Sequence, residues 1–154
     1  MAVITQEQRA VLESGPQHMY LFVNAGDAAP VGYPMTAFWA DEAVHFTTYR
    51  AARKTARLLA DDRVCCLFAP CATEPAPDRV LLVQGRATLA DSDVIASRAA
   101  DLDATGRPLP VPPDVQAKVA RRLDAGKRVV FAVAVEDAAF VPVPTQEATW
   151  RVRI

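Results

Sequence analysis

The chain has 154 residues, of which 51% are hydrophobic and 23% charged, and its formal net charge is -1. This composition is typical of a single globular domain over residues 1–154 and is too apolar for a disordered chain. The balanced charge gives no indication of nucleic-acid binding or of attraction to an anionic membrane. No apolar run approaches the roughly 20 residues that span a bilayer, and the first residues do not resemble a signal peptide. We therefore expect a cytoplasmic protein with no nucleic-acid partner and no membrane partner.

The cysteines point to a reducing compartment and not to a disulfide framework. Cys65, Cys66 and Cys71 are odd in number, and adjacent cysteines make a poor disulfide with each other. Neither His18 nor His45 lies at a zinc-finger spacing from them. We expect no metal site, and we expect Cys65 and Cys66 to be small buried residues of a strand.

The first part of the chain predicts a helix, a run of strands and a second helix. Thr5 and Gln8 form a capping-box pattern that begins a helix ending near Ser14. Short runs rich in aromatic and β-branched residues then predict strands, and turn residues that include Pro30 and Gly32 separate them. The predicted strands are His18–Asn24, Tyr33–Trp39 and Ala43–Tyr49, and the second predicted helix is Ala51–Ala60.

The second part of the chain predicts further strands around a pair of helices. Gly85 indicates a bulge or a close backbone approach within its strand. Asp114 is the predicted cap of an amphipathic helix that Gly126 ends, and Ser92 is the predicted cap of the helix before it. The predicted strands are Arg63–Ala69, Arg79–Leu89, Arg128–Val135, Ala138–Val143 and Thr149–Arg153, and the helices run from Ser92 to about Ala104 and from Asp114. Consecutive strands with isolated helices favour a mainly β, α+β fold built on an antiparallel barrel or sandwich.

A group of cations gives the clearest chemical signal. Arg50, Arg53, Lys54 and Arg57 have the i, i+3, i+4, i+7 spacing that places them on one stripe of a helix. Like charges at this spacing repel, and cations in a first turn oppose the helix dipole, by about 0.2–1 kcal/mol each. A phosphate bound there would remove this cost. The alternative is a solvated cationic face whose arginines pair with carboxylates elsewhere.

The segment Phe46–Phe68, FTTYRAARKTARLLADDRVCCLF, resembles a family pattern. A strand ending in F-T-T, an R-K pair several residues later, a helix, and then D-x-R-V with an apolar strand is the pattern of the pyridoxamine 5′-phosphate oxidase-like proteins. These are split β-barrels that bind flavin or deazaflavin. The resemblance covers roughly residues 6–89 and extends to the last third only through the order of elements.

The resemblance implies an antiparallel split β-barrel homodimer with FMN at the subunit interface. Arg53 and Lys54 match the pair that binds the FMN phosphate, with Arg50 as a further candidate. The other implied cofactor-binding residues are Thr47 and Thr48 at a strand end, and Pro34, Met35 and Thr36 along the ring. The implied activity is that of an oxidoreductase in which hydride passes between the ring and a small molecule. No catalytic acid or base is identified, and the second strand lacks the Arg and Lys that the oxidase itself carries.

Three alternatives stay open. The same residues could hold a deazaflavin coenzyme, or the barrel could carry flavin or haem without turnover, or its groove could be empty. A second basic region is either a solvated helix face or a grip on a polyanionic cofactor tail; it consists of Lys118, Arg121, Arg122, Lys127 and Arg128. His45 is either a plain strand residue or a catalytic one.

Overall fold

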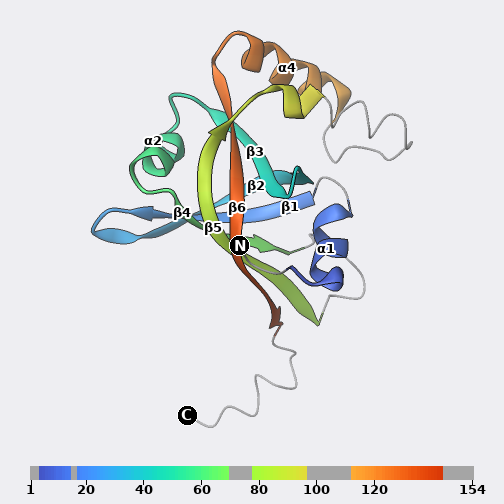
Figure 1. The fold of residues 1–154 in the computed structure, drawn as a ribbon. Helices are drawn as coiled ribbons and strands as arrows, with labels where there is room; N and C mark the ends of the chain where they lie inside the picture. Colours follow the sequence, from blue (N-terminus) through green and yellow to red (C-terminus); the bar gives the residue numbers. More distant parts are fainter. Residues whose placement is uncertain (1–3, 15–16, 70–77, 97–111, 144–154) are drawn as a thin grey trace.

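A closed antiparallel β-barrel forms the body of the protein (Figure 1). The computed structural model describes residues 4–14, 17–69, 78–96 and 112–143. Around the barrel the strand order is β1-β2-β3-β6-β5-β4. The strands are β1 (Gln17–Ala25), β2 (Ala28–Ala40), β3 (Ala43–Tyr49), β4 (Arg63–Phe68), β5 (Arg79–Ala90) and β6 (Arg128–Pro142); the helices are α1 (Gln6–Glu13), α2 (Arg53–Ala60) and α4 (Pro113–Asp124). The predicted mainly β, α+β class is therefore confirmed, and the barrel is favoured over the sandwich.

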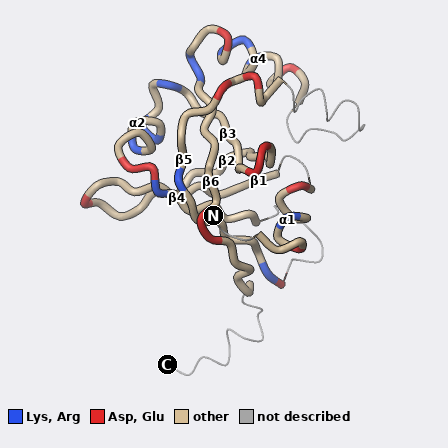
Figure 2. Tube along the Cα trace, in the orientation of Figure 1, with Lys and Arg blue, Asp and Glu red and all other residues tan. Residues whose placement is uncertain are grey.

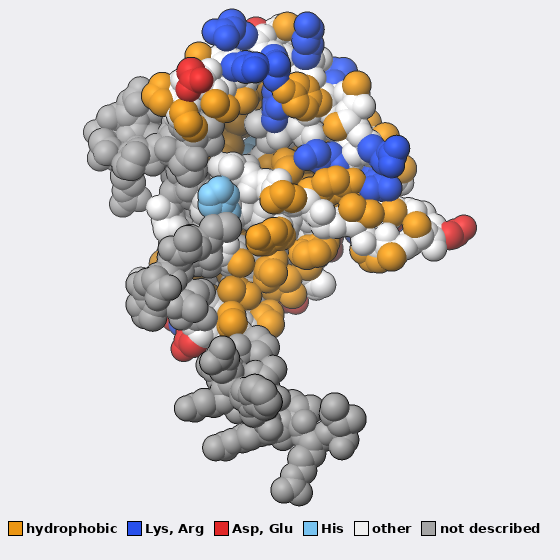
Figure 3. Space-filling model, turned by 180° about the vertical axis from the view of Figure 1, so that it is seen from behind, with side chains coloured by type: hydrophobic (Ala, Val, Ile, Leu, Met, Phe, Trp, Pro, Cys, Tyr) orange, Lys and Arg blue, Asp and Glu red, His pale blue; other side chains and the backbone are white. Residues whose placement is uncertain are grey.

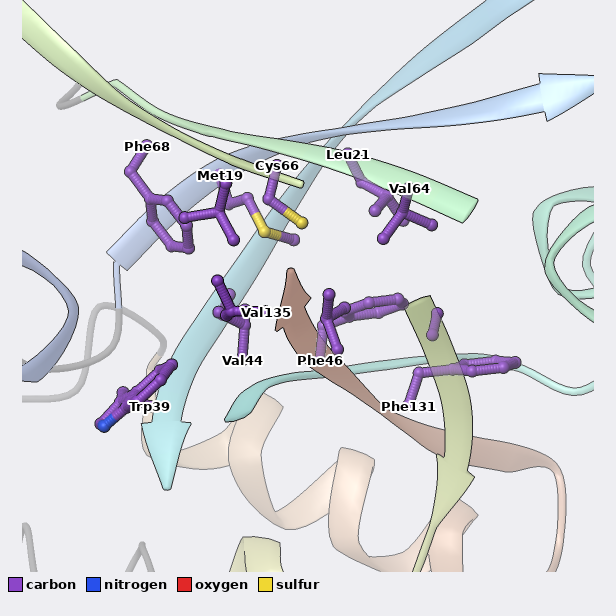
Figure 4. Packing of buried hydrophobic residues seen from close by; sticks show 14 of the residues in the cluster. Met19, Leu21, Trp39, Val44, Phe46, Val64, Cys66, Phe68, Phe131 and Val135 are labelled. Carbon is purple, nitrogen blue, oxygen red and sulfur yellow. The ribbon is translucent and has the colours of Figure 1, made fainter. Parts of the chain in front are cut away.

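Alternating side chains of the strands fill the barrel interior (Figure 4). Phe46 of β3 and Phe131 of β6 are opposite each other, and their rings stack with centroids 5.7 Å apart. Cys66 lies in this core as a buried free thiol, and Cys65 points to the other side of β4 and is half-buried. The expectation of small buried strand residues is therefore confirmed for Cys66, whereas Cys65 lies in the strand but is only half-buried.

Helix α1 is held against the barrel by its predicted capping box. The Thr5 hydroxyl accepts a hydrogen bond from the Gln8 amide at 3.2 Å, and the Gln8 side chain accepts one from the Thr5 amide at 2.9 Å. The Nε2 group of Gln8 then donates to the carbonyl oxygen of Ala138 in β6 at 2.8 Å. One buried glutamine thus caps the helix and fixes it to the sheet.

Strand β2 is longer than predicted because Pro30 and Gly32 lie within it. Between Val23 and Ala25, β1 has one residue where β2 has two, so β2 contains a bulge that includes Pro30. A bulge tolerates proline because a residue there need not donate to the ladder. Gly32 is opposite Phe22, whose ring would be 2.8 Å from any Cβ at that position. The expected break at these residues is therefore wrong.

The predicted strands Arg128–Val135 and Ala138–Val143 are one continuous strand, β6. The register of β5 and β6 shifts at Gly85, where Glu136 is the extra residue. A Cβ on Gly85 would overlap the carbonyl oxygen of Ala134, so both the bulge and the close approach predicted there are confirmed. The bulge bends β6 without ending it, and this is why the sequence looked like two strands.

Helix α4 differs from its prediction at its start and on its apolar face. It begins at Pro113, with Pro112 as N-cap, so Asp114 lies in the first turn and is not the cap. Proline suits this position because its missing N–H would have no helical partner. Gly126 ends the helix region with φ 69°, as predicted. None of the helix residues is buried, and Val115 remains 40% exposed.

Several predictions fall outside the described residues. They concern Cys71, the predicted helix beyond residue 96, the proline-rich stretch before α4, and the predicted strand Thr149–Arg153. Within the part of the chain that the structure describes, no helix has the length and apolar character needed to cross a membrane.

Candidate functional site

The predicted stripe of four cations is wrong for Arg50. Helix α2 begins at Arg53, and the chain turns between β3 and the helix because the Tyr49 carbonyl accepts a 2.6 Å hydrogen bond from Thr55 Oγ1. Arg50 therefore precedes the helix, and its Nε donates to the carbonyl oxygen of Gly126 at 2.8 Å. This contact ties Arg50 to the segment between α4 and β6.

The remaining cations of α2 lie against β2. The Lys54 ammonium is 3.3 Å from the Met35 sulfur and 5.0 Å from the centroid of the Tyr33 ring. Arg57 donates from Nη1 to the Tyr33 hydroxyl at 2.6 Å. Arg53 is exposed. The structure thus brings Lys54 and Met35, two of the predicted cofactor residues, into contact, and it places Tyr33 against both Lys54 and Arg57.

Strand β2 presents an edge here that pairs with no other strand among the described residues. Asp41–Glu42 has positive φ at both residues and joins β2 to β3 in a two-residue turn, so Ala40 forms a hydrogen-bonded pair with Ala43. Pairing with β3 ends at Ala37. Beyond it, every second residue of β2 directs its backbone away from β1. Thr36 therefore offers an N–H and a C=O at the edge, and Pro34 offers a C=O alone.

The predicted cofactor residues divide between the two faces of the barrel wall. Met35 and Thr48 are on the inner face, and Pro34, Thr36 and Thr47 are on the outer face. Thr48 is 1% exposed, and its hydroxyl is the buried side-chain oxygen without a hydrogen-bond partner among the described residues. The pairing of β2 with β3 ends at Ala37, so the two strands separate beside Met35. Lys54 of α2 contacts Met35 at this split between β2 and β3.

Two arginines from the second basic region complete the cationic surface. Arg128 at the start of β6 donates to the Thr47 hydroxyl at 3.2 Å and to the Thr47 carbonyl at 3.1 Å. Its guanidinium is 4.4 Å from the centroid of the Tyr49 ring. Arg122 of α4 is 5.1 Å from the same centroid and donates to the Tyr49 hydroxyl. Sequence spacing could not predict this contact, since only the β3–β6 pairing brings Tyr49 to Arg128.

These cations have no carboxylate partner among the described residues. The observed ion pairs involve other arginines, and Asp61 and Asp62, the acids nearest to α2 in the sequence, pair with Arg63 and Arg86. Figure 2 shows where Lys and Arg occur along α2 and around the end of α4, and Figure 3 shows their side chains gathered in these two regions of the surface. The cations of this surface, none of which has a described carboxylate within 4.0 Å, are Arg50, Arg53, Lys54, Arg57, Arg122 and Arg128.

Burial and mutual repulsion act on the middle of this group. Burial lowers the pKa of Lys54, and the nearby charge of Arg128 lowers it further. Burial also lowers the pKa of Arg128, with a contribution from Arg122. Each charge is thus held close to another of the same sign and partly out of water, an arrangement that a bound anion would stabilise.

His45 lies on the outer face of β3, buried and stacked on Phe38 with ring centroids 5.4 Å apart. Its Nδ1 is 3.2 Å from the Ala43 carbonyl, and burial lowers its pKa. These contacts are those of a packed strand residue. No group of three or more His, Cys, Asp or Glu residues in the described ranges is arranged to hold a metal ion.

Comparison with known proteins identifies the fold. No family model and no curated protein matches the sequence. An F420 reductase of known structure is 21% identical, with a TM-score of 0.58 over 84% of this chain and 94% of that one. A Listeria innocua protein described as a putative pyridoxamine 5′-phosphate oxidase is 18% identical, with a TM-score of 0.59 over 88% and 95%.

A haem-binding protein from Mycobacterium smegmatis is 17% identical, with a TM-score of 0.64; the match covers 92% of this chain and 55% of that one. Proteins that share a fold can bind different ligands, so these similarities identify the architecture of the chain. The ligand has to be argued from the residues of the site. The chain has the split β-barrel fold of the pyridoxamine 5′-phosphate oxidase-like proteins.

Proposed function

We propose that the protein binds FMN and acts as an oxidoreductase. One observation carries the proposal: cations of α2 that have no described carboxylate partner lie at the β2 edge that pairs with no described strand. The contact between Lys54 and Met35 joins the two. When bound, FMN supplies hydride transfer at its ring, and the protein supplies binding, orientation and shielding from water. The substrate is a small molecule that exchanges hydride with the ring.

The phosphate fits the cations of α2. Lys54 and Arg57 are held at the β2 edge by Tyr33, and Arg53 is exposed beside them. Arginine and lysine bind phosphate oxygens through charge-assisted hydrogen bonds. The unpartnered Thr48 hydroxyl is a further donor at the split between β2 and β3. A phosphate that accepts from these groups would neutralise the repulsion and satisfy a buried hydroxyl.

The ring fits the free edge of β2. A flavin ring carries an N–H group between two carbonyl oxygens, so it needs both acceptors and donors from the protein. Thr36 offers both from its backbone, and Pro34 offers an acceptor. Backbone groups that pair with no strand are otherwise left to water, and a planar ring with matching groups would replace that water.

A homodimer would cover the apolar outer face next to this edge. Cross-strand pairing makes the face continuous over four strands, through Tyr20, Phe22, Pro34, Cys65, Leu67 and Leu82. Tyr20 is 39% exposed and Phe22 is 37% exposed, and Figure 3 shows hydrophobic side chains gathered beside the cations. Contiguous apolar patches of this kind mark interfaces, and a second copy here would close the cofactor groove. Size measurement in solution tests it: Leu67→Arg should give monomers, and a wild-type monomer would refute it.

A deazaflavin-dependent reductase is the second candidate, because the cationic surface extends past α2 to Arg128 and Arg122. The same groups would hold its first phosphate, and the same edge its ring.

Titration of the purified protein with FMN, followed by the visible spectrum and flavin fluorescence, tests the proposal. Lys54→Gln should weaken FMN binding by about 10- to 100-fold, since charge-assisted hydrogen bonds are worth about 1.5–3 kcal/mol. Lys118→Gln is the control, because Lys118 is exposed on α4 away from β2. Equal affinities of the two variants would overturn the phosphate assignment. Reduction of bound FMN by NADPH would distinguish an enzyme from a carrier, and a haem spectrum would replace the flavin assignment.

A further inference from the structure

We propose that Arg122 and Arg128, arranged around the Tyr49 ring, form a second anion subsite beside the one proposed for the FMN phosphate, and that this subsite admits a cofactor with a second anionic group on its tail. The inference rests on the proposed function for the ring and the first phosphate, and it goes beyond FMN, which has one phosphate.

The subsite is built from three elements. Tyr49 ends β3, Arg128 begins β6 directly opposite it, and Arg122 comes from the last turn of α4. The Tyr49 ring is within 4.4 Å of one guanidinium carbon and 5.1 Å of the other. Cation–π contacts and the Tyr49 hydroxyl hold the two guanidinium groups in place before any ligand arrives.

Both guanidinium groups keep donors free. Arg128 uses its Nε and one Nη2 hydrogen on Thr47, and Arg122 uses Nη1 on Tyr49. A guanidinium has more N–H donors than these contacts occupy. Neither arginine has a carboxylate within 4.0 Å among the described residues. Two half-buried guanidinium groups with open donors and no counter-charge are a receptor for an anion.

The subsite is continuous with the first one. Thr55, next to Lys54 in α2, donates to the Tyr49 carbonyl at 2.6 Å, and the Tyr49 ring contacts both Arg122 and Arg128. The charge of Arg128 also lowers the pKa of Lys54. The three charges therefore form a row from the β2 edge to the end of α4. One phosphate at Lys54 would neutralise one end of this row only, which leaves Arg122 and Arg128 for a second anion.

The other cations of α4 show what a solvated face looks like in this protein. Arg121 and Lys118 are exposed, and neither has a side-chain partner among the described residues. Arg122, next to Arg121 in the sequence, is half-buried against Tyr49. The second basic region predicted from the sequence thus divides into solvated residues and residues directed into the row.

The ligand chemistry that fits is a ring cofactor with a phosphate and a further anion along its tail, either a second phosphate or carboxylates. Riboflavin, FMN and FAD share one ring and differ by having no phosphate, one phosphate or two, while a deazaflavin coenzyme with a glutamate tail supplies carboxylates. The affinities of these four ligands for the wild-type protein, Arg122→Gln and Arg121→Gln are to be measured by fluorescence titration.

We expect Arg122→Gln to lower the affinity for one of the two ligands with longer tails, FAD or the deazaflavin coenzyme, by about tenfold. The affinities for FMN and riboflavin should stay unchanged. The ligand that loses affinity identifies the second anion as phosphate or carboxylate. Arg121→Gln should change none of the four. The proposal is overturned if Arg122→Gln weakens neither long-tailed ligand, or if it weakens FMN to the same extent.

Failure of the proposed function would give a different result, namely that no ring ligand binds the wild-type protein. A thermal-unfolding arm still tests the subsite in that case. Inorganic pyrophosphate should raise the melting temperature of the wild-type protein and of Arg121→Gln more than phosphate does, and Arg122→Gln should lose the difference. Equal shifts in all three proteins would refute the subsite.

Discussion

Two buried threonines give opposite predictions for the same substitution. Thr48 of β3 is 1% exposed and its hydroxyl has no partner among the described residues, whereas Thr55 of α2 is 2% exposed and donates to the Tyr49 carbonyl at 2.6 Å. Valine replaces each hydroxyl by a methyl group of nearly the same shape. The two variants therefore differ in the hydrogen bond that is lost and hardly at all in packing.

Whether each variant gains or loses stability depends on whether the hydroxyl that it removes makes a hydrogen bond. A buried hydroxyl without a partner costs about 1–3 kcal/mol, so Thr48→Val should raise the free energy of unfolding of the ligand-free protein by about 1 kcal/mol or more. Its melting temperature should rise by about 2–4 °C. Thr55→Val removes the hydrogen bond to the Tyr49 carbonyl, which then has one donor fewer. The substitution should therefore lower the free energy of unfolding by about 1–2 kcal/mol.

Urea unfolding of both variants, without ligand, measures these changes, and FMN titration of the same samples measures the functional cost. Thr48→Val should bind FMN several-fold more weakly, because the hydroxyl is unpartnered only while no phosphate is bound, and Thr48→Ser should restore the affinity. A Thr48→Val protein as destabilised as Thr55→Val would refute the reasoning. So would a stabilised variant with unchanged FMN affinity, which would remove Thr48 from the site.

Three further predictions concern the fold. Gly85→Ala should lower the free energy of unfolding by about 1–3 kcal/mol or more, since its Cβ would overlap the Ala134 carbonyl; an unchanged urea midpoint would contradict this. Thr5→Ala should lower it by about 1 kcal/mol through loss of the helix cap, and circular dichroism during thermal unfolding would reveal the change. Burial raises the pKa of Cys66 to about 12, so Cys66 should stay unmodified by iodoacetamide at pH 8 in the folded protein and should react once urea unfolds it, as peptide mass spectrometry would detect.

Elements with a local signal could be predicted from the sequence. The capping box of α1, the strand Ala43–Tyr49 and the glycine that faces a bulge each depend on a few neighbouring residues, and each is confirmed. Boundaries that depend on tertiary context were wrong. Pro30 is accommodated by a bulge that only the β1–β2 register creates, and Glu136 interrupts the strand pattern without ending the strand.

The candidate site was predicted in part for the same reason. Lys54 and Met35 were chosen from a motif, and the structure places them in contact. Arg50 was placed on a helix that begins three residues later, because residue spacing alone does not show at which residue the helix begins after the strand. Arg128 was assigned to a helix end, and its contact with Thr47 joins residues 81 positions apart. The FMN, oxidoreductase and homodimer predictions remain predictions.

The free edge of β2 has a consequence for solubility. An exposed strand edge is a template on which any extended chain can add, and this is a common route to aggregation. Pro34 interrupts the template, because at the position where an incoming strand needs an N–H it provides none. The same proline leaves its carbonyl available to a small planar molecule. The edge is thus closed to a second polypeptide strand and open to a ligand, and Pro34→Ala should produce a protein that precipitates more readily while it stays folded.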